Sequence, residues 1–405
     1  MRRRVGTVRD ERRFLEYDHI KELVARGPSD AGILSISLDI PAERFHEGDF
    51  WRSLLNSGLR GLGQEYPDDK RLQQAIEETF KELQGLEREA RFRSLIYFRS
   101  AESGWSWWRS LQGSVATRFA WGRRPAVFPL IDYLHREPPV GVFLVSRGDV
   151  QCFIWRQSIL EEIRHWELDL DTEHWRFYQG RVFPQPMRGQ VVATHEERFA
   201  RRLEEAVRRE FAALAPQLEE EAAKHECEAI FVFGARDVRD LFVDSLSHPL
   251  QQKVVETGER RFPTVDLKAL NEAVAQEVAW WRERTRRLEL QALLESLGAG
   301  GRGVIGGQEV LDLLAHHRVQ RLLVCADLQG PGYRRRDDSL SVVAGLSPLR
   351  LRVTENQEQD YVLEPNFLEE IVALAIDRET EIVPMHGMCG QRLKGMGGLG
   401  AWLRY

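Results

Sequence analysis

The stretch VGVFLVSRGDVQCFIWRQ, residues 140–157, decides the fold of the middle of this chain. Its two apolar runs are separated by turn residues around Gly148 and Asp149. Two apolar runs on either side of a short glycine-containing turn predict a β-hairpin. Just upstream the regular pattern is interrupted by four prolines: Pro125, Pro129, Pro138 and Pro139. Because proline disturbs helices and strands, we place a domain boundary near residue 137.

After the hairpin and a polar, proline-containing stretch, the sequence predicts two helices around a buried strand. Residues 195–214 repeat apolar side chains on one helical face until Pro216 disturbs the pattern. The run CEAIFVFG predicts a buried strand, and Asp237 is placed to cap the helix after it. A second long helix is expected over residues 266–297, before the glycine-rich GAGGRG. We therefore expect a middle domain over residues 138–297.

The chain before this domain also mixes strands and helices. GILSISLDI, residues 32–40, alternates with period two, which predicts a strand. FWRSLLNSGLRGL and KRLQQAIEETFKELQGLEREA repeat apolar residues every three or four positions, as amphipathic helices do, and RSLIYFRS at 93–100 returns to a strand pattern. These segments predict an N-terminal α/β domain over residues 1–137.

The last part of the chain alternates helix and strand patterns. The order is helix QEVLDLLAHH, strand RLLVCAD, helix NFLEEIVALAI and strand EIVPM, followed by glycine-rich GMGGLG and the terminal AWLRY. Alternation of this kind indicates an α/β layered domain, here over residues 298–405. The predicted fold class is therefore α/β, in three domains.

Composition limits the classes of function. The 405 residues are 42% hydrophobic and carry a formal net charge of -6, which argues against a protein that coats nucleic acid by bulk charge. No run approaches the ~20 apolar residues of a membrane span, and the basic start lacks the apolar core of a signal peptide. We therefore expect a cytoplasmic protein. Cysteines without CxxC spacing are typical of reduced thiols, and this chain has four: Cys152, Cys227, Cys325 and Cys389.

Four stretches spread over the chain carry a resemblance to a known family. They are LSISLDI, RPAVFPLIDYL running into VGVFLVSRGD, GGRGVIGGQEVLDLLAHHRVQRLLVCAD, and the ending GGLGAWLRY. Together they resemble the bacterial branch of the archaeo-eukaryotic class I peptide-release-factor superfamily, which includes Pelota and hibernation factors of the Balon type. The resemblance implies a ribonuclease-H-like middle domain and a C-terminal α/β/α layered domain of the kink-turn-binding ribosomal-protein type.

The tripeptide Gly-Gly-Gln at residues 306–308 copies the tip with which release factors admit water to peptidyl-tRNA. In those factors the tip belongs to a long loop of the middle domain, whereas here it opens the third domain. Val310, Leu313 and Leu314 predict a helix that packs on its own domain. We therefore expect the glycines to form a turn and Gln308 to be a helix-start residue without a catalytic role.

Where the resemblance places the catalytic loop, residues 184–190, the chain has PQPMRGQ. Met187 and Arg188 replace the glycine pair that lets a main-chain amide approach the ester, and Gly189 and Gln190 follow. Prolines stiffen this approach. We predict that these four residues contact ribosomal RNA without hydrolysing peptidyl-tRNA. A plain solvated loop is the alternative for the stretch.

A basic run in GYRRRDD is the second candidate for RNA binding. Arg334, Arg335 and Arg336 are expected on a loop after a strand, where they would suit the phosphates of ribosomal RNA. A solvated turn is equally compatible with this run.

Aromatic and positive residues are mixed in GWSWWRS, as they are on base-stacking surfaces. Burial of Trp105, Trp107 and Trp108 in a core is the favoured interpretation, because large aromatic side chains are mostly buried.

His386 and Cys389 in PMHGMCG have a spacing that could serve a metal ion. Only two ligands are in sight where zinc needs about four. We expect no metal and no cofactor.

The function expected from the resemblance is that of a ribosome-binding translation factor. It would occupy the tRNA entry (A) site of idle or stalled ribosomes, in hibernation or rescue. The expected partners are the ribosomal RNA of that site and a translational GTPase such as elongation factor Tu, with no membrane. Two alternatives stay open: a hydrolase that acts on peptidyl-tRNA through Gln190, and a nuclease, which would need about three or four converging carboxylates.

Overall fold

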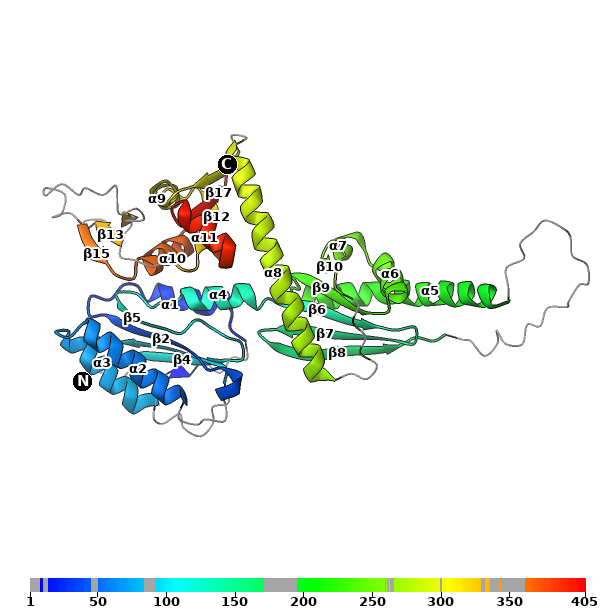
Figure 1. Cartoon of the computed structure of the whole chain (residues 1–405), viewed down its shortest axis with the longest axis horizontal. Coiled ribbons are helices and arrows are strands. Elements are labelled where there is room, and N and C mark those ends of the chain that lie inside the picture. The colour runs from blue at the N-terminus through cyan, green and yellow to red at the C-terminus, as the bar shows by residue number, and fades with distance from the viewer. Residues whose placement is uncertain are drawn as a thin grey trace, which may run out of the picture. The chain divides into compact units, whose positions relative to one another are not determined.

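The chain forms two compact units (Figure 1). One unit combines residues 1–137 with residues 282–405, and the other comprises residues 138–281. The computed structural model describes residues 8–9, 14–44, 50–83, 92–170, 195–258, 260, 262, 266–298, 301–328, 332–335, 342–343 and 361–405. Within these ranges, no helix is both long and apolar enough to cross a bilayer. The division into three domains stays a prediction.

A five-stranded sheet in the order β1-β4-β3-β2-β5 builds the N-terminal part of the first unit. Its strands are β1 (Val8–Arg9), β2 (Ile33–Asp39), β3 (Ser94–Ser100), β4 (Ser106–Leu111) and β5 (Arg118–Gly122). The strands predicted over 32–40 and 93–100 are confirmed as β2 and β3, which pair antiparallel. Ser35 and Ser37 of β2 are buried like their apolar neighbours, because helices cover both faces of the sheet.

Four helices and a short 3-10 turn accompany this sheet. They are α1 (Tyr17–Ala25), η1 (Ala42–Arg44), α2 (Phe50–Glu65), α3 (Lys70–Leu83) and α4 (Phe128–Arg136). Helices α2 and α3 pack on one face through residues such as Leu55, Leu59 and Leu72, as their apolar repeats predicted. Helices α1 and α4 pack on the other face, against Ile96 and Phe98 of β3.

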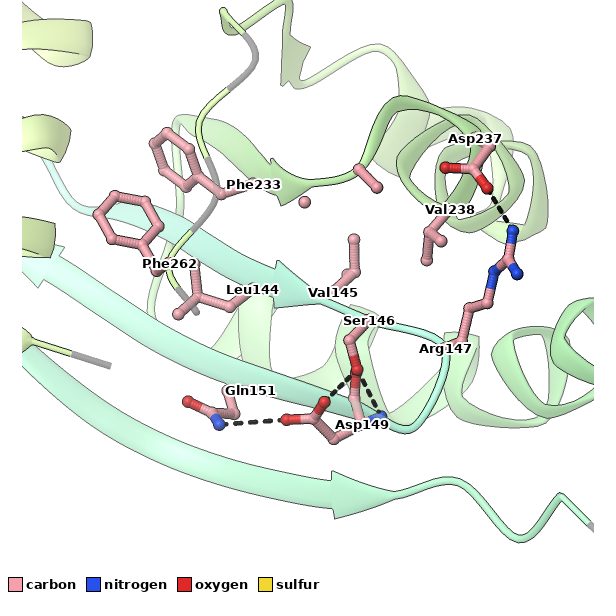
Figure 2. Close-up of a pocket in the computed structure, with 12 residues that line it drawn as sticks. Leu144, Val145, Ser146, Arg147, Asp149, Gln151, Phe233, Asp237, Val238 and Phe262 are labelled. Carbon is pink, nitrogen blue, oxygen red and sulfur yellow. Dashed lines mark hydrogen bonds and ion pairs between the residues drawn. The ribbon is translucent and has the colours of Figure 1, made fainter. Parts of the chain in front are cut away.

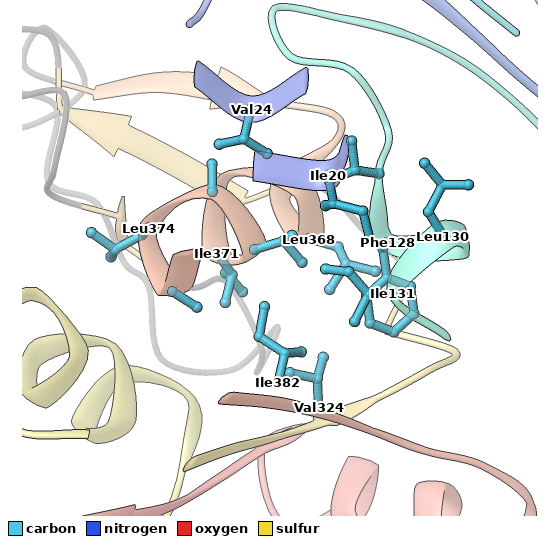
Figure 3. Close-up of a cluster of buried hydrophobic side chains, with 14 of the residues drawn as sticks. Ile20, Val24, Phe128, Leu130, Ile131, Val324, Leu368, Ile371, Leu374 and Ile382 are labelled. Carbon is cyan, nitrogen blue, oxygen red and sulfur yellow. The ribbon is translucent and has the colours of Figure 1, made fainter. Parts of the chain in front are cut away.

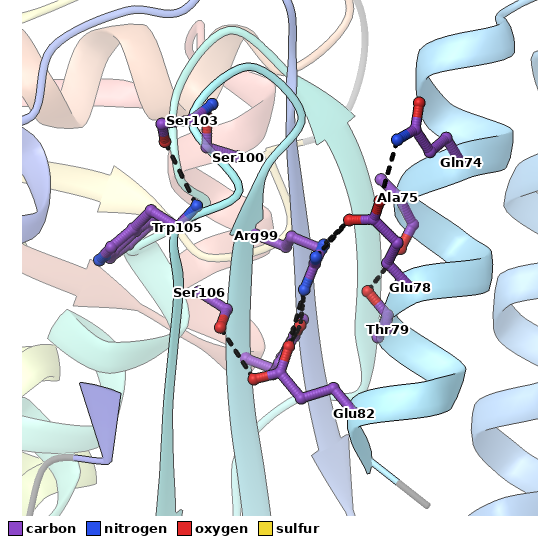
Figure 4. Close-up of polar contacts among 11 residues, drawn as sticks. Gln74, Ala75, Glu78, Thr79, Glu82, Arg99, Ser100, Ser103, Trp105 and Ser106 are labelled. Carbon is purple, nitrogen blue, oxygen red and sulfur yellow. Dashed lines mark hydrogen bonds and ion pairs between the residues drawn. The ribbon is translucent and has the colours of Figure 1, made fainter. Parts of the chain in front are cut away.

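Arg99 of β3 joins α3 to the sheet (Figure 4). Its guanidinium forms ion pairs with Glu78 and Glu82 of α3, and its Nη1 lies 2.7 Å from Glu82 Oε2. The Ser106 hydroxyl of β4 donates to Glu82 Oε1 at 2.8 Å. A charge at a largely buried position needs such partners, so this network determines how α3 lies on the sheet.

The tryptophans of GWSWWRS belong to the core, as predicted. Trp105, Trp107 and Trp108 are at most 9% exposed. Trp107 stacks on Phe98 with ring centroids 5.7 Å apart. Their aromatic faces are therefore used in packing.

A four-stranded sheet in the order β11-β17-β12-β16 builds the C-terminal part of the first unit. Its strands are β11 (Gly303–Ile305), β12 (Val319–Cys325), β16 (Glu381–Met385) and β17 (Leu399–Leu403), and its helices are α9 (Gly307–Ala315), α10 (Phe367–Asp377) and α11 (Gly387–Gly395). Helices α9 and α10 cover one face, whereas α11 and the end of α8 (Leu267–Gly298) cover the other. The four predicted segments of this part are confirmed as α9, β12, α10 and β16.

Three elements of this part were not predicted, β11, α11 and β17. All three lie in sequence with several glycines, which is more typical of turns. Strand β17 is antiparallel to both of its neighbours, β11 and β12. The sheet is therefore mixed.

The first and last thirds of the chain share one hydrophobic core. Figure 3 shows Ile20 of α1 and Phe128 and Ile131 of α4 near Ile371 of α10 and Ile382 of β16. These side chains are at most 5% exposed. Segments far apart in sequence thus fold as a single body.

Buried ion pairs border this shared core. Arg118 Nη1 lies 2.9 Å from Glu369 Oε1, and Arg124 Nε lies 2.8 Å from Glu370 Oε2. The backbone N–H of Phe128 also donates to Glu369 Oε2, at 3.1 Å. Burial raises the pKa of Glu369, while the neighbouring Arg118 counteracts that effect.

The second unit is built on a five-stranded sheet in the order β10-β9-β6-β7-β8. Its strands are β6 (Val140–Val145), β7 (Asp149–Arg156), β8 (Ile159–Glu167), β9 (Ala229–Gly234) and β10 (Val254–Val255). The predicted hairpin is confirmed as β6 and β7, with Val145 opposite Val150. Strand β8 was not predicted. Its sequence ILEEIRHWE is highly charged, as is common for a strand at the edge of a sheet.

Helices cover both faces of this sheet. They are α5 (His195–Lys224), α6 (Arg236–Ser245) and α7 (His248–Gln251), together with the first part of α8. Helices α5 and α6 pack on one face, and α8 packs on the other. The prediction that Pro216 disturbs the helix pattern was wrong. Helix α5 continues past it, because Leu218 and Ala222 extend the buried face.

Candidate functional site

The stretch predicted to contact ribosomal RNA, Met187, Arg188, Gly189 and Gln190, lies outside the described residues. Its role stays a prediction.

The basic run Arg334, Arg335 and Arg336 was expected on a loop, and the structure differs from this expectation. Arg334 and Arg335 lie in strand β13 (Gly332–Arg335), not on a loop, and Arg336 lies outside the described residues. Strand β13 is central in a small antiparallel sheet with β14 (Val342–Val343) and β15 (Tyr361–Glu364). The segment is a strand because its backbone pairs with β14 on one side and with β15 on the other. Whether the run binds RNA stays a prediction.

The tripeptide at 306–308 occupies the position that we predicted. Helix α9 begins at Gly307, and Gly306 before it has a φ of 139°, a conformation that glycine adopts readily. The Gln308 side chain donates to Asp312 Oδ1 at 2.9 Å, one turn along the helix. Val310 and Leu314 are fully buried. The tripeptide is thus the start of a packed helix.

His386 and Cys389 have partners other than a metal. His386 Nε2 lies 2.5 Å from Asp132 Oδ1, and Cys389 is buried among apolar side chains. Among the residues that the structure describes, no group of three or more His, Cys, Asp or Glu side chains is placed to hold a metal ion.

The structure offers a further site that the sequence did not indicate. A pocket of about 530 Å³ lies in the second unit, at the end of the sheet where β6 and β9 terminate and β7 begins (Figure 2). The carboxyl ends of neighbouring parallel strands are a common place for ligands in α/β sheets. Gly234 keeps these ends close together, because a Cβ atom there would lie 2.4 Å from the Val145 carbonyl oxygen.

One side of the pocket is apolar. Phe233 and Phe262 meet edge to face, with ring centroids 5.7 Å apart and planes at 88°. Leu144 and Val238 extend this wall. Figure 2 shows the two aromatic rings together, away from the charged groups.

The opposite side presents Asp149, held by three neighbours. The Ser146 hydroxyl donates to Asp149 Oδ1, and Gln151 Nε2 donates to Asp149 Oδ2 at 3.2 Å. His165 Nε2 lies 3.3 Å from the same Oδ2. Ser146 Oγ also accepts the backbone N–H groups of Gly148 and Asp149, each at 3.0 Å. The hairpin turn therefore holds the carboxylate in place.

An ion pair stands at the mouth of the pocket. Arg147 Nη2 donates to Asp237 Oδ2 at 2.6 Å, and this hydrogen bond is the main reason that the pKa of Asp237 is lowered. Both side chains are more than half exposed. The prediction that Asp237 caps the helix was wrong: Ala235 is the N-cap of α6, and Asp237 lies in the first turn.

Among the residues that the structure describes, two carboxylates line this pocket, Asp149 and Asp237. Both are engaged by cationic or amide groups of the chain. A two-metal nuclease would need about three or four carboxylates free to converge on its ions.

The sequence did not reveal this pocket because its walls come from separate segments. The hairpin turn and the segment after β9 were both singled out, but only as local structure. Phe262, which completes the apolar wall, follows outside any predicted element.

Comparison with known protein families gives a match over part of the chain. Residues 138–259 match a family described as bacterial archaeo-eukaryotic release factor family 5. This segment contains β6 to β10 and most of the residues that line the pocket. This match confirms the resemblance to the release-factor superfamily that was drawn from the sequence.

Several solved structures are similar over much of the chain. The archaeal translation termination factor aRF1 has 17% identity and a TM-score of 0.25, covering 96% of this chain and 97% of that one. Archaeal Pelota, in a ribosome-bound model with ABCE1, has 15% identity and a TM-score of 0.38, covering 77% and 78%. Dom34 of S. cerevisiae has 10% identity and a TM-score of 0.36, covering 77% and 80%. No curated protein matches the chain.

Proposed function

We propose that this protein is a ribosome-associated translation factor that occupies the tRNA entry site of idle or stalled ribosomes, without hydrolysing peptidyl-tRNA. The observation that carries this proposal is the release-factor match over residues 138–259. The matched segment includes residues 184–190, where the resemblance places the catalytic loop. A protein that keeps this matched domain but lacks the glycine pair of the catalytic loop is suited to bind the ribosome without hydrolysing peptidyl-tRNA.

The residues of that loop argue against hydrolysis. A release factor needs a flexible glycine pair, so that the main-chain amide next to its glutamine can approach the reacting ester. This chain has Met187 and Arg188 at the corresponding positions, preceded by Pro184 and Pro186. Proline restricts φ, and an arginine can pair with an RNA phosphate. The loop therefore favours contact with ribosomal RNA.

The partners follow from the same proposal. The ribosome is the main one, which would place the protein in the cytoplasm. Release and rescue factors of this superfamily work with translational GTPases, so we include one, such as elongation factor Tu, as a delivery partner. Hibernation and rescue are the two settings in which such a factor would act.

Peptide release separates this proposal from the hydrolase alternative. Purified protein is added to bacterial ribosomes that carry labelled peptidyl-tRNA, and released peptide is measured over time. We expect release at the spontaneous rate, and Gln190→Ala should change nothing in this assay. Release above that rate, abolished by Gln190→Ala, would instead establish the hydrolase.

A further inference from the structure

We propose that the first unit binds a small phosphate group at Arg286, on the part of α8 that covers the C-terminal sheet. The observation that carries this proposal is a buried guanidinium whose N–H groups lack acceptors. The residues concerned all belong to the first unit, and the inference does not depend on the proposed function.

The Arg286 side chain is only 8% exposed. Within the part of the chain that the structure describes, its Nε and Nη2 atoms have no hydrogen-bond partner. Its Nη1 atom lies 3.9 Å from Glu283 Oε2, which is too long for a hydrogen bond. A buried charged group without acceptors is unfavourable, so this guanidinium requires one.

The two nitrogens without a partner share one edge of the guanidinium. The Nε–H bond and one N–H bond of Nη2 point in the same direction. Such a parallel pair of donors matches two oxygens of a single carboxylate or phosphate group. The pattern at Arg286 therefore favours one oxyanion over separate water molecules.

The neighbouring carboxylates of the chain do not supply these oxygens. Asp132 of α4 has its Oδ1 2.5 Å from His386 Nε2, and its Oδ2 accepts from Arg136 Nε at 3.0 Å. Burial lowers the pKa of Arg286, and the negative charges of Asp132 and Glu283 counteract this only in part. A ligand would complete what these two carboxylates leave undone.

Positive charges surround this edge of Arg286. Arg282 and Arg136 act electrostatically on Arg286, and Arg287 and Arg392 act together with it on the nearby Cys389. Burial and the charges of Arg282 and Arg286 lower the pKa of His135 to about 3. A phosphate carries up to two negative charges, so it balances this cluster better than a carboxylate with one.

The position of the edge favours a small ligand. Buried N–H groups suit a phosphate group that can enter by itself, whereas the backbone of an RNA strand needs an open groove. Solvent is close, because the Glu283 side chain is 39% exposed and Arg287 and Arg392 are exposed. Inorganic phosphate, or the terminal phosphate of a small molecule, is the class of ligand that fits.

The test titrates the full-length protein at constant ionic strength, in a buffer without phosphate. Isothermal titration is run with inorganic phosphate, acetate and a short single-stranded RNA. We expect phosphate to saturate one site and to bind about ten-fold more tightly than acetate, and RNA not to compete with it. Phosphate should also raise the midpoint of thermal unfolding, since a ligand that binds only the folded state stabilises it.

Variants locate the binding. Arg286→Lys keeps the positive charge but removes the parallel donors, so phosphate affinity should fall about ten-fold. Arg236→Lys is the matched control, since the Arg236 side chain is 76% exposed and belongs to the second unit. Arg392→Gln removes one charge at an exposed position, so it tests the site even if Arg286→Lys fails to fold. Its phosphate affinity should fall about three-fold.

Several results would overturn the inference. They are no saturable binding of phosphate, acetate binding as tight as that of phosphate, and wild-type phosphate affinity in Arg286→Lys or, where that variant does not fold, in Arg392→Gln. Binding of the RNA without binding of free phosphate would overturn the choice of a small ligand. Ribosome co-sedimentation is independent of each of these outcomes.

Discussion

The carboxylate of Asp132 links the two ends of the sequence. It lies on α4 and is 5% exposed. Burial tends to raise its pKa, but the hydrogen bond with His386 and the charge of Arg136 outweigh burial and lower it. His386 follows β16, 254 positions further along the chain. Local patterns cannot reveal a partner at such a distance, which is why this partner of His386 was not predicted from the sequence.

A pH-dependent stability follows from this pair. A carboxyl whose pKa is lowered by folding stabilises the folded state above the ordinary carboxyl range, and that contribution is lost as pH falls through the lowered pKa. Asp132→Asn should therefore cost about 1–3 kcal/mol near neutral pH, because a hydrogen bond to a charged group is lost. Its stability should also fall less steeply in acid than that of the wild type.

Urea denaturation over a series from neutral to acid pH measures this effect. Asp18→Asn is the control, because the Asp18 side chain is 74% exposed. If the free energies of unfolding of Asp132→Asn and the wild type fell equally with pH, the Asp132–His386 pair would contribute nothing to the pH dependence of stability.

Several elements with a clear apolar period were predicted from the sequence, and other elements were missed. The β6–β7 hairpin, β2, α9 and α10 follow their apolar patterns. Strand β8 was missed because its charged side chains are tolerated at an edge, and α11 and β17 were missed because their glycines resemble turns. In these cases the structure is determined by pairing and packing with distant segments, and the local propensity of the residues for helix or strand does not determine it.

Pro216 in α5 gives a prediction at this scale. Proline removes one backbone hydrogen bond in a helix interior and costs roughly 3 kcal/mol relative to alanine. Pro216 is exposed, so its ring contributes little packing. Pro216→Ala should therefore raise the free energy of unfolding of the second unit by about 1–3 kcal/mol. Urea denaturation measures it, with the exposed Glu220→Ala as control, and an unchanged or lowered stability would contradict this view of the helix.

At the scale of the whole molecule, the first and last thirds of the chain fold together. The sequence predicted the segments of both thirds but not their shared core, because that core depends on contacts between residues more than 200 positions apart. The pocket in the second unit has the same origin on a smaller scale, since three separate segments build it. The sequence predicts several of the local segments that build the shared core and the pocket. It does not predict that these segments lie together.

The shared core can be tested at one buried side chain. Ile371 of α10 is fully buried between the two thirds. Ile371→Ala should destabilise the first unit by about 2–5 kcal/mol, because it leaves a cavity. Hydrogen exchange should quicken in both α4 and β12, whereas Met388→Ala, at an 83% exposed position, should change neither. Loss of protection confined to residues after 282 would show that the two thirds fold separately.

The central claim is that this protein binds the tRNA entry site of the ribosome, and competition with tRNA tests it most directly. Purified protein is sedimented with vacant bacterial ribosomes, and with the same ribosomes after their entry site has been filled with tRNA. We predict that the protein pellets with vacant ribosomes and stays in the supernatant when the entry site is filled. Failure to pellet with vacant ribosomes, or equal binding in both cases, would contradict the claim.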